Sequence, residues 1–134
     1  MSAQDTRRVV HQMLAALDRA DWAALEAHPG LYETRQRYPL NKAAVPDSRH
    51  EVVVEVLQDD WMACVATVTG THTGPLLGVP PTGKQLRYNV LLVDQVQNGL
   101  IVQHWAVPDV LSIFQQLGMP LFPGASGSPP PTPA

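Results

Sequence analysis

The first part of the chain has a helical pattern of hydrophobic and polar positions. Its apolar residues recur at spacings of three and four, which places them on one face of a helix: Val10, Met13, Leu14 and Leu17. Either Ser2 or Asp5 can cap the start of this helix. Asp21 can cap a short second helix, which Pro29-Gly30 would end. The pattern therefore predicts two helices within the first 30 residues.

Strands dominate the second part. Residues 30–48 show no clear period, because Pro39 and Pro46 interrupt it. β-Branched residues then predict strands at 51–57, 61–71, 85–96 and 100–105. Residues 70–83 contain four glycines and three prolines, which indicates a loop. A last helix is predicted from Val110 to Leu117, with Gly118 as its C-terminal stop.

Asn98-Gly99 predicts a two-residue hairpin turn between the last two strands. In that register Asp94 pairs with Gln103 and Leu92 with Trp105. One face of the sheet then carries Tyr88, Val90, Leu92, Asp94, Val96, Ile101, Gln103 and Trp105. The other face carries Asn89, Leu91, Val93, Gln95, Leu100, Val102 and His104. Both faces are largely apolar, so we expect helices to cover one face and a second copy of the chain, in a homodimer, to cover the other.

Composition and charge narrow the class of protein. The chain has 134 residues, which favours one domain, over residues 1–119. Residues 120–134 hold six of the 13 prolines and predict a flexible tail rich in Pro, Gly and Ser. Nine basic against twelve acidic residues give a net charge of −3, which argues against nucleic acid as a partner. No apolar run is long enough for a membrane span or a signal peptide, and Cys64 is the only cysteine, so we expect a cytoplasmic protein.

Several motifs together point to a known family. They are the loop Gly70–Gly83 with its Pro80-Pro-Thr-Gly83 end, the 98–101 hairpin, His104-Trp105, Asp109 and Gln116-Leu-Gly118. From about residue 46 to 118 the chain resembles the SnoaL-like polyketide or ester cyclase family. The resemblance implies a nuclear-transport-factor-2-like α+β cone, in which N-terminal helices, a curved antiparallel sheet and a C-terminal helix enclose one apolar pocket. It also implies a homodimer formed through the sheet, a small apolar, polyketide-like substrate, and intramolecular aldol closure without a metal or organic cofactor.

The chain departs from this family at the residues that carry the chemistry. In the aldol cyclases that it resembles, the acid/base aspartate directly follows the position of Trp105, where this chain has Ala106. The assisting polar residues fall at Val90 and Leu92. Because none of these side chains transfers a proton, we expect the standard mechanism to be absent. The family also places a strand and a helix where this chain has only residues 31–44, which predicts a shortened pocket wall.

Asp109 and Asp94 are the catalytic candidates that remain. Asp109 precedes an apolar stripe, as a helix N-cap does, and a cap and a catalytic role are compatible. Asp94 would act as a base if its face lines a dry cavity, which would raise its pKa; near the open end of the hairpin it would be solvated or paired with a basic residue such as Arg87. The ligand-binding candidates are Tyr88, Val90, Leu92, Trp105, Ala106 and His72.

The histidines have less specific interpretations. His72 either holds the glycine-rich loop by hydrogen bonds or points at a ligand. His104 faces away from Trp105, which favours a structural or dimer-interface role. Neither has a second histidine or carboxylate at a metal-ligand spacing, so we expect no metal site.

Three functions stay open from the residues. The first is a cofactor-independent acid–base catalyst of the cyclase, isomerase or hydrolase kind, acting through a relocated carboxylate. The second is a non-catalytic protein that binds or carries a small apolar molecule. The third is a dimeric interaction module whose pocket is filled by its own side chains.

Overall fold

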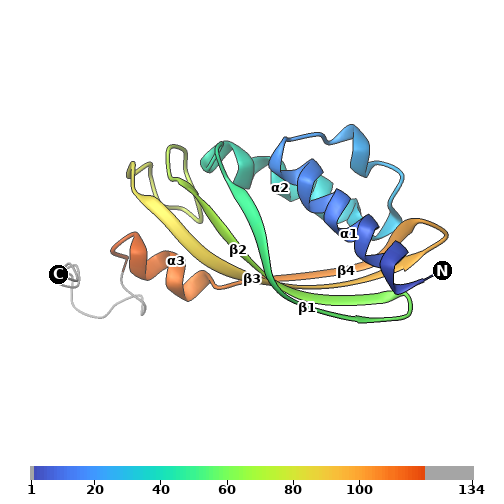
Figure 1. The fold of residues 1–134 in the computed structure, drawn as a ribbon. Coiled ribbons are helices and arrows are strands. Elements are labelled where there is room, and N and C mark those ends of the chain that lie inside the picture. The colour runs from blue at the N-terminus through green and yellow to red at the C-terminus, as the bar shows by residue number, and fades with distance from the viewer. Residues whose placement is uncertain (1, 120–134) are drawn as a thin grey trace.

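The computed structural model describes residues 2–119, and the predicted tail lies outside them (Figure 1). The helices are α1 (Ala3–Asp18), α2 (Tyr32–Ala44) and α3 (Val110–Gln116), with short 3-10 turns η1 (Ala23–Leu25) and η2 (Pro29–Leu31). The strands are β1 (Arg49–Gln58), β2 (Trp61–Thr71), β3 (Gln85–Gln97) and β4 (Leu100–Pro108). The described residues therefore form the expected α+β fold, with a sheet that does not close.

The four strands of the described residues form an antiparallel meander in the order β1-β2-β3-β4. The predicted turn between β3 and β4 is confirmed, because Asn98 and Gly99 both have positive φ, 53° and 75°. Ser2 is the cap of α1, through a capping box with Asp5. Asp21 accepts from the Ala24 N–H and begins η1, which stands where a second helix was predicted.

The predicted register of the last hairpin is wrong beyond its first two pairs. Val96 pairs with Ile101 as expected, but Gln95 pairs with Gln103, so Val102 is an extra residue in β4. This β-bulge moves every later side chain of β4 to the opposite face. Asp94 is paired with His104, and Trp105 is paired with Val93 on the other face.

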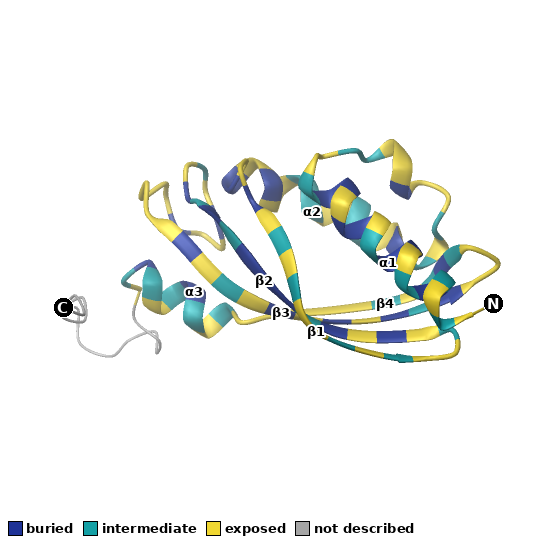
Figure 2. Ribbon diagram, in the orientation of Figure 1, coloured by how far each residue is buried: buried dark blue, intermediate teal, exposed yellow. Residues whose placement is uncertain are grey.

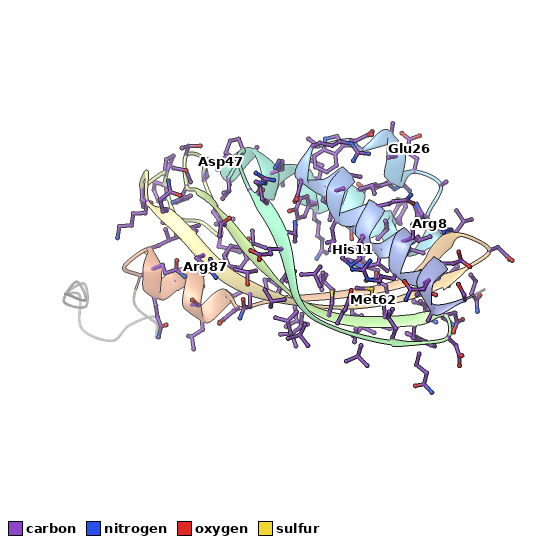
Figure 3. The ribbon with its side chains drawn as sticks, viewed as in Figure 1. Arg8, His11, Glu26, Asp47, Met62 and Arg87 are labelled. Atoms are coloured by element: carbon purple, nitrogen blue, oxygen red, sulfur yellow. The ribbon has the colours of Figure 1, made fainter. Side chains whose placement is uncertain are left out.

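The inner face of the sheet is the one that α1 covers. Figure 2 shows the buried positions concentrated along α1 and the strands beneath it. Met62, labelled in Figure 3, packs there with Val10 and Met13 of α1. From β2, β3 and β4 the same core receives Cys64, Ala66, Val68, Val90, Leu92, Val96 and Ile101. The prediction that helices cover one face is therefore confirmed.

α2 corrects the expectation for residues 30–48. A 13-residue helix occupies most of this segment and continues through Pro39. Its only buried residues are Lys42 and Ala44, both in the last turn. The pocket wall that was expected to be shortened therefore consists of one helix, α2, which lies on the same side of the sheet as α1 (Figure 1). Over most of its length, α2 is packed only loosely against the rest of the protein.

α3 packs at the edge of β3 where β4 ends. β4 ends opposite Val90, so the edge of β3 before that residue has no strand partner. The Gln116 side chain takes the place of a strand there: its amide accepts from the Arg87 N–H (3.0 Å) and donates to the Arg87 carbonyl (2.8 Å). Gly118, with φ 75°, follows the helix at the expected stop. Among residues 2–119, no helix combines the length and apolar character that a membrane crossing needs.

Candidate functional site

A cavity of about 810 Å³ lies between α2 and the inner face of the sheet. β3 and β4 supply one wall, with Val90, Leu92 and Ala106. α2 supplies the opposite wall, with Arg37, Tyr38 and Asn41 among its side chains. Small-molecule sites in proteins measure about 300–1,000 Å³. The space under the loosely packed helix is therefore large enough for a small organic molecule.

A buried histidine–aspartate pair lies at one end of this cavity. The His104 Nδ1–H donates to Asp94 Oδ1 over 2.6 Å. The Asp94 side chain is fully buried and the His104 side chain is 7% exposed. Because a carboxylate only accepts, this bond places a proton on Nδ1 and makes Nε2 the free acid/base position of the imidazole. His104 lines the cavity, so the pair offers proton-transfer chemistry there.

The second oxygen of Asp94 makes the pair unusual. Oδ2 is buried and has no hydrogen-bond partner within residues 2–119. The bond from the His104 ring is therefore the side-chain hydrogen bond that the structure records for this carboxylate within residues 2–119.

The bulge and η2 together position His104. Val102 is the extra residue of the bulge, and Gly30 lies against its backbone, where an added Cβ would come within 2.7 Å of the Val102 carbonyl carbon. His28 accepts from the Ile101 N–H over 2.9 Å, and burial lowers the pKa of its imidazole. η2 is thereby held against β4 just before His104, at the point where the register between β3 and β4 changes.

The middle of the cavity is apolar, and the far end carries tyrosines. Val90, Leu92 and Ala106 lie between the two ends and offer no proton donor or acceptor. Tyr38 and Tyr88 line the far end. Burial raises the pKa of both hydroxyls, so they stay protonated at neutral pH and can donate hydrogen bonds to carbonyl oxygens.

The predicted site residues fall into two groups. Tyr88, Val90, Leu92 and Ala106 line the cavity, and Asp94 lies behind its wall as the partner of His104. Trp105 borders the cavity, but its ring stacks on Trp61 of the outer face, 6.2 Å between centroids.

Asp109 and His72 lie elsewhere. Asp109 is exposed and caps α3, accepting from the Ser112 N–H over 3.0 Å. His72 is fully buried and shares a hydrogen bond with the Thr82 hydroxyl, away from the cavity lining. Sequence reasoning did not identify His104 or Tyr38 as site residues. Within residues 2–119, no group of three or more His, Cys, Asp or Glu side chains could hold a metal ion.

The open antiparallel sheet, the helices that cover its inner face and the cavity between them have the α+β fold of a nuclear-transport-factor-2-like cone. A family model described as SnoaL-like polyketide cyclase matches residues 5–117, and the chain belongs to that family. The resemblance in the motifs of the second half is thus confirmed over nearly the whole described chain.

Three known proteins are moderately similar to this chain. The aklanonic acid methyl ester cyclase DnrD of Streptomyces peucetius is 29% identical over 80 residues, which are 59% of this chain and 55% of DnrD. The chain thus spans about half the length of that curated relative. The structure of TsrD from Streptomyces laurentii superposes with a TM-score of 0.79 at 23% identity, over 88% of this chain and 98% of TsrD. AclR, a putative hydroxylase from Streptomyces galilaeus, gives a TM-score of 0.79 at 25% identity, over 87% and 98%.

Proposed function

We propose that this chain binds a small, largely apolar carbonyl compound in its cavity and catalyses proton transfer on it without a cofactor. The observation that carries the proposal is the buried Asp94–His104 pair, which fixes an imidazole on the wall of a cavity of about 810 Å³. In this proposal His104 is the catalytic residue, and Asp94 is a positioning residue that orients the ring through their hydrogen bond. The proposal gives Asp109 no catalytic role, because its side chain caps α3 and is not part of the cavity lining.

The reaction that fits is an intramolecular aldol closure or the related enolisation. Nε2 of His104 removes a proton from the carbon beside a carbonyl group, and the enolate carbon attacks a second carbonyl carbon of the same molecule. The new alkoxide then takes the proton back from His104, so the product is an isomer of the substrate. Tyr38 and Tyr88 can donate to carbonyl oxygens at the far end. Because DnrD is an aklanonic acid methyl ester cyclase, a polyketide ester is the substrate class to test first.

The acid/base reaction can be tested with a simple bicyclic ketone. 2-Tetralone has acidic protons beside its carbonyl, so a base at the site will exchange them for deuterium in D₂O. We expect the protein to accelerate this exchange and His104→Asn to lose about 100-fold of that acceleration, the scale of one general acid or base. The matched control is His11→Asn, because His11 lies on α1, paired with Glu55 and away from the cavity lining (Figure 3).

The apolar middle of the cavity favours a second function, binding or carriage without catalysis. The middle of the cavity is lined by Val90, Leu92 and Ala106, whose side chains can contact an apolar ligand but cannot transfer a proton. Saturable binding of 2-tetralone with no exchange above buffer would support this function and reject the catalytic one. With aklanonic acid methyl ester, a cyclase gives a product of unchanged mass and new chromatographic retention, whereas a carrier returns the ester intact. Failure of both compounds to bind would contradict both functions.

A further inference from the structure

A second histidine–aspartate pair lies at the far end of the cavity. His50 is at the start of β1, and Asp18 is the last residue of α1. The His50 Nδ1–H donates to Asp18 Oδ1 over 2.7 Å, and the His50 backbone N–H donates to the same carboxylate, 3.1 Å to Oδ2. The His50 side chain is 5% exposed and lines the cavity.

These bonds fix the ring and its tautomer. With its proton on Nδ1, a neutral His50 has a lone pair on Nε2. The hydrogen bonds that the structure records for this imidazole within residues 2–119 use Nδ1 alone. The bonds between His50 and Asp18 attach α1 to β1 and use the Nδ1 side of the imidazole. They give no role to Nε2, on the other side of the ring.

The two pairs serve different parts of the cavity. His50 is level with Val68 and Tyr88, which are paired across β1, β2 and β3. Tyr88 precedes Asp94 by six positions on β3, about 20 Å of extended strand. The Tyr38 ring lies 6.2 Å from the His50 ring, so the far end combines two phenol donors with one imidazole acceptor. A single small group of a ligand cannot engage both histidines.

We propose that His50 is a recognition residue that accepts a hydrogen bond from an acidic hydroxyl, a phenol or an enol, at the end of the ligand remote from His104. This inference rests on the proposed function, because it assumes that the cavity binds a small apolar molecule. It narrows the ligand class to compounds with a carbonyl group at one end and an acidic hydroxyl at the other. A methyl ether at the same place cannot donate, so it loses this contact.

The test compares 2-naphthol with 2-methoxynaphthalene, which has the same ring system but a methyl group in place of the hydroxyl hydrogen and so cannot donate. By fluorescence titration, we expect the protein to bind 2-naphthol about tenfold more tightly, the scale of one well-placed hydrogen bond. His50→Phe removes this preference and retains affinity for the ether. His11→Phe is the matched control, because His11 is also paired with a carboxylate, that of Glu55, but lies outside the cavity lining and should keep the preference. His104→Asn also keeps the preference.

A measurement on the unchanged protein guards against misfolding of His50→Phe. In ¹⁵N-histidine-labelled protein, 2-naphthol should shift the Nε2 resonance of His50, and 2-methoxynaphthalene should not. Equal binding of the two probes, a preference that survives in folded His50→Phe, or an unmoved Nε2 resonance would overturn this inference and leave the proposed function standing. If neither probe binds, the role of His50 and the proposed function are both rejected.

Discussion

Asp94 places a carboxylate in a fully buried position, and His104 is its hydrogen-bond partner there. Removing one member of a buried pair leaves the other uncompensated, whereas replacing both with apolar residues is often nearly neutral. We therefore expect His104→Leu to lower the free energy of unfolding by about 3 kcal/mol, because Asp94 loses its donor. Asp94→Leu should cost about 2 kcal/mol, because the Nδ1–H of His104 loses its acceptor.

A double variant shows how much of each loss in unfolding free energy comes from the interaction between Asp94 and His104. Asp94→Leu combined with His104→Leu should lose clearly less than the sum of the two single changes, as measured by urea unfolding at pH 7. Additive losses would mean that the two side chains do not interact in the folded protein. That result would also remove the orienting role that the proposed mechanism gives to Asp94.

Cys64 lies near Asp94, and the reactivity of its thiol can be measured directly. Burial, with the nearby Asp94 and Glu55 carboxylates, raises the pKa of the Cys64 thiol from 9.0 to about 11. At pH 8 the thiolate is then about a hundredfold rarer than for a thiol with the ordinary pKa. Iodoacetamide should therefore alkylate the folded protein at least about 100-fold more slowly than the protein in urea.

The raised pKa of Cys64 also has a consequence for stability. The folded state holds the thiol proton more tightly than the unfolded state, so this contribution is complete below pH 9.0 and is lost as pH rises through about 11. Cys64→Ala should show a smaller loss of unfolding free energy over that interval than the unchanged chain. Fast alkylation at pH 8 without denaturant would show that Cys64 is not buried as described.

One side chain of α3 takes the place of a strand at the edge of the sheet. Gln116 of α3 makes two hydrogen bonds to the Arg87 backbone, at the part of β3 that β4 does not reach. Gln116→Ala should lower the free energy of unfolding by about 2 kcal/mol, because two backbone groups lose their partners. Gln115→Ala, one exposed position earlier in the same helix, is the matched control and should change it little. Equal effects of the two changes in urea unfolding would contradict this account of α3.

The sequence predicted best those elements whose signals are local. Asn98-Gly99, Gly118 and the Ser2 cap each act within a few residues, and the structure has all three features. α2 was missed because Pro39 removes one helical hydrogen bond, and an interior proline is typical of a break. The bulge at Val102 was missed for another reason: its neighbour in space is Gly30, about 70 positions away in the chain, which a local pattern does not reveal.

The bulge at Val102 limited how much of the cavity lining could be predicted from the sequence. The lining residues of β3 were identified from the period-two pattern, which the structure keeps on that strand. On β4 the pattern changes phase after the bulge, so Trp105 was assigned to the inner face and His104 to the outer face, the reverse of the structure. The His50–Asp18 pair joins residues 32 positions apart, and neither residue has a sequence signal for the other.

The outer face of the sheet has no cover within residues 2–119. Two complete rows across the four strands are apolar: Val54, Val65, Leu91 and Val107, and beside them Val56, Ala63, Val93 and Trp105. Trp61 extends the second row by stacking on Trp105. Continuous apolar surface of this kind is uncommon on monomers and marks interaction sites. We propose that a second copy of the chain covers this face, as the apolar pattern of both faces predicted.

A charge placed in the centre of these rows tests the homodimer. Leu91 is 54% exposed, so Leu91→Glu leaves the fold intact but buries a carboxylate in the interface of a dimer. We expect the unchanged chain to sediment as a dimer and Leu91→Glu as a monomer at the same concentration, a weakening of about a hundredfold or more. Leu40→Glu is the matched control, because Leu40 is 74% exposed on α2 and should leave the dimer intact. Dissociation of both variants would reflect added charge in general, and a monomeric unchanged chain would reject the second copy as the cover of this face.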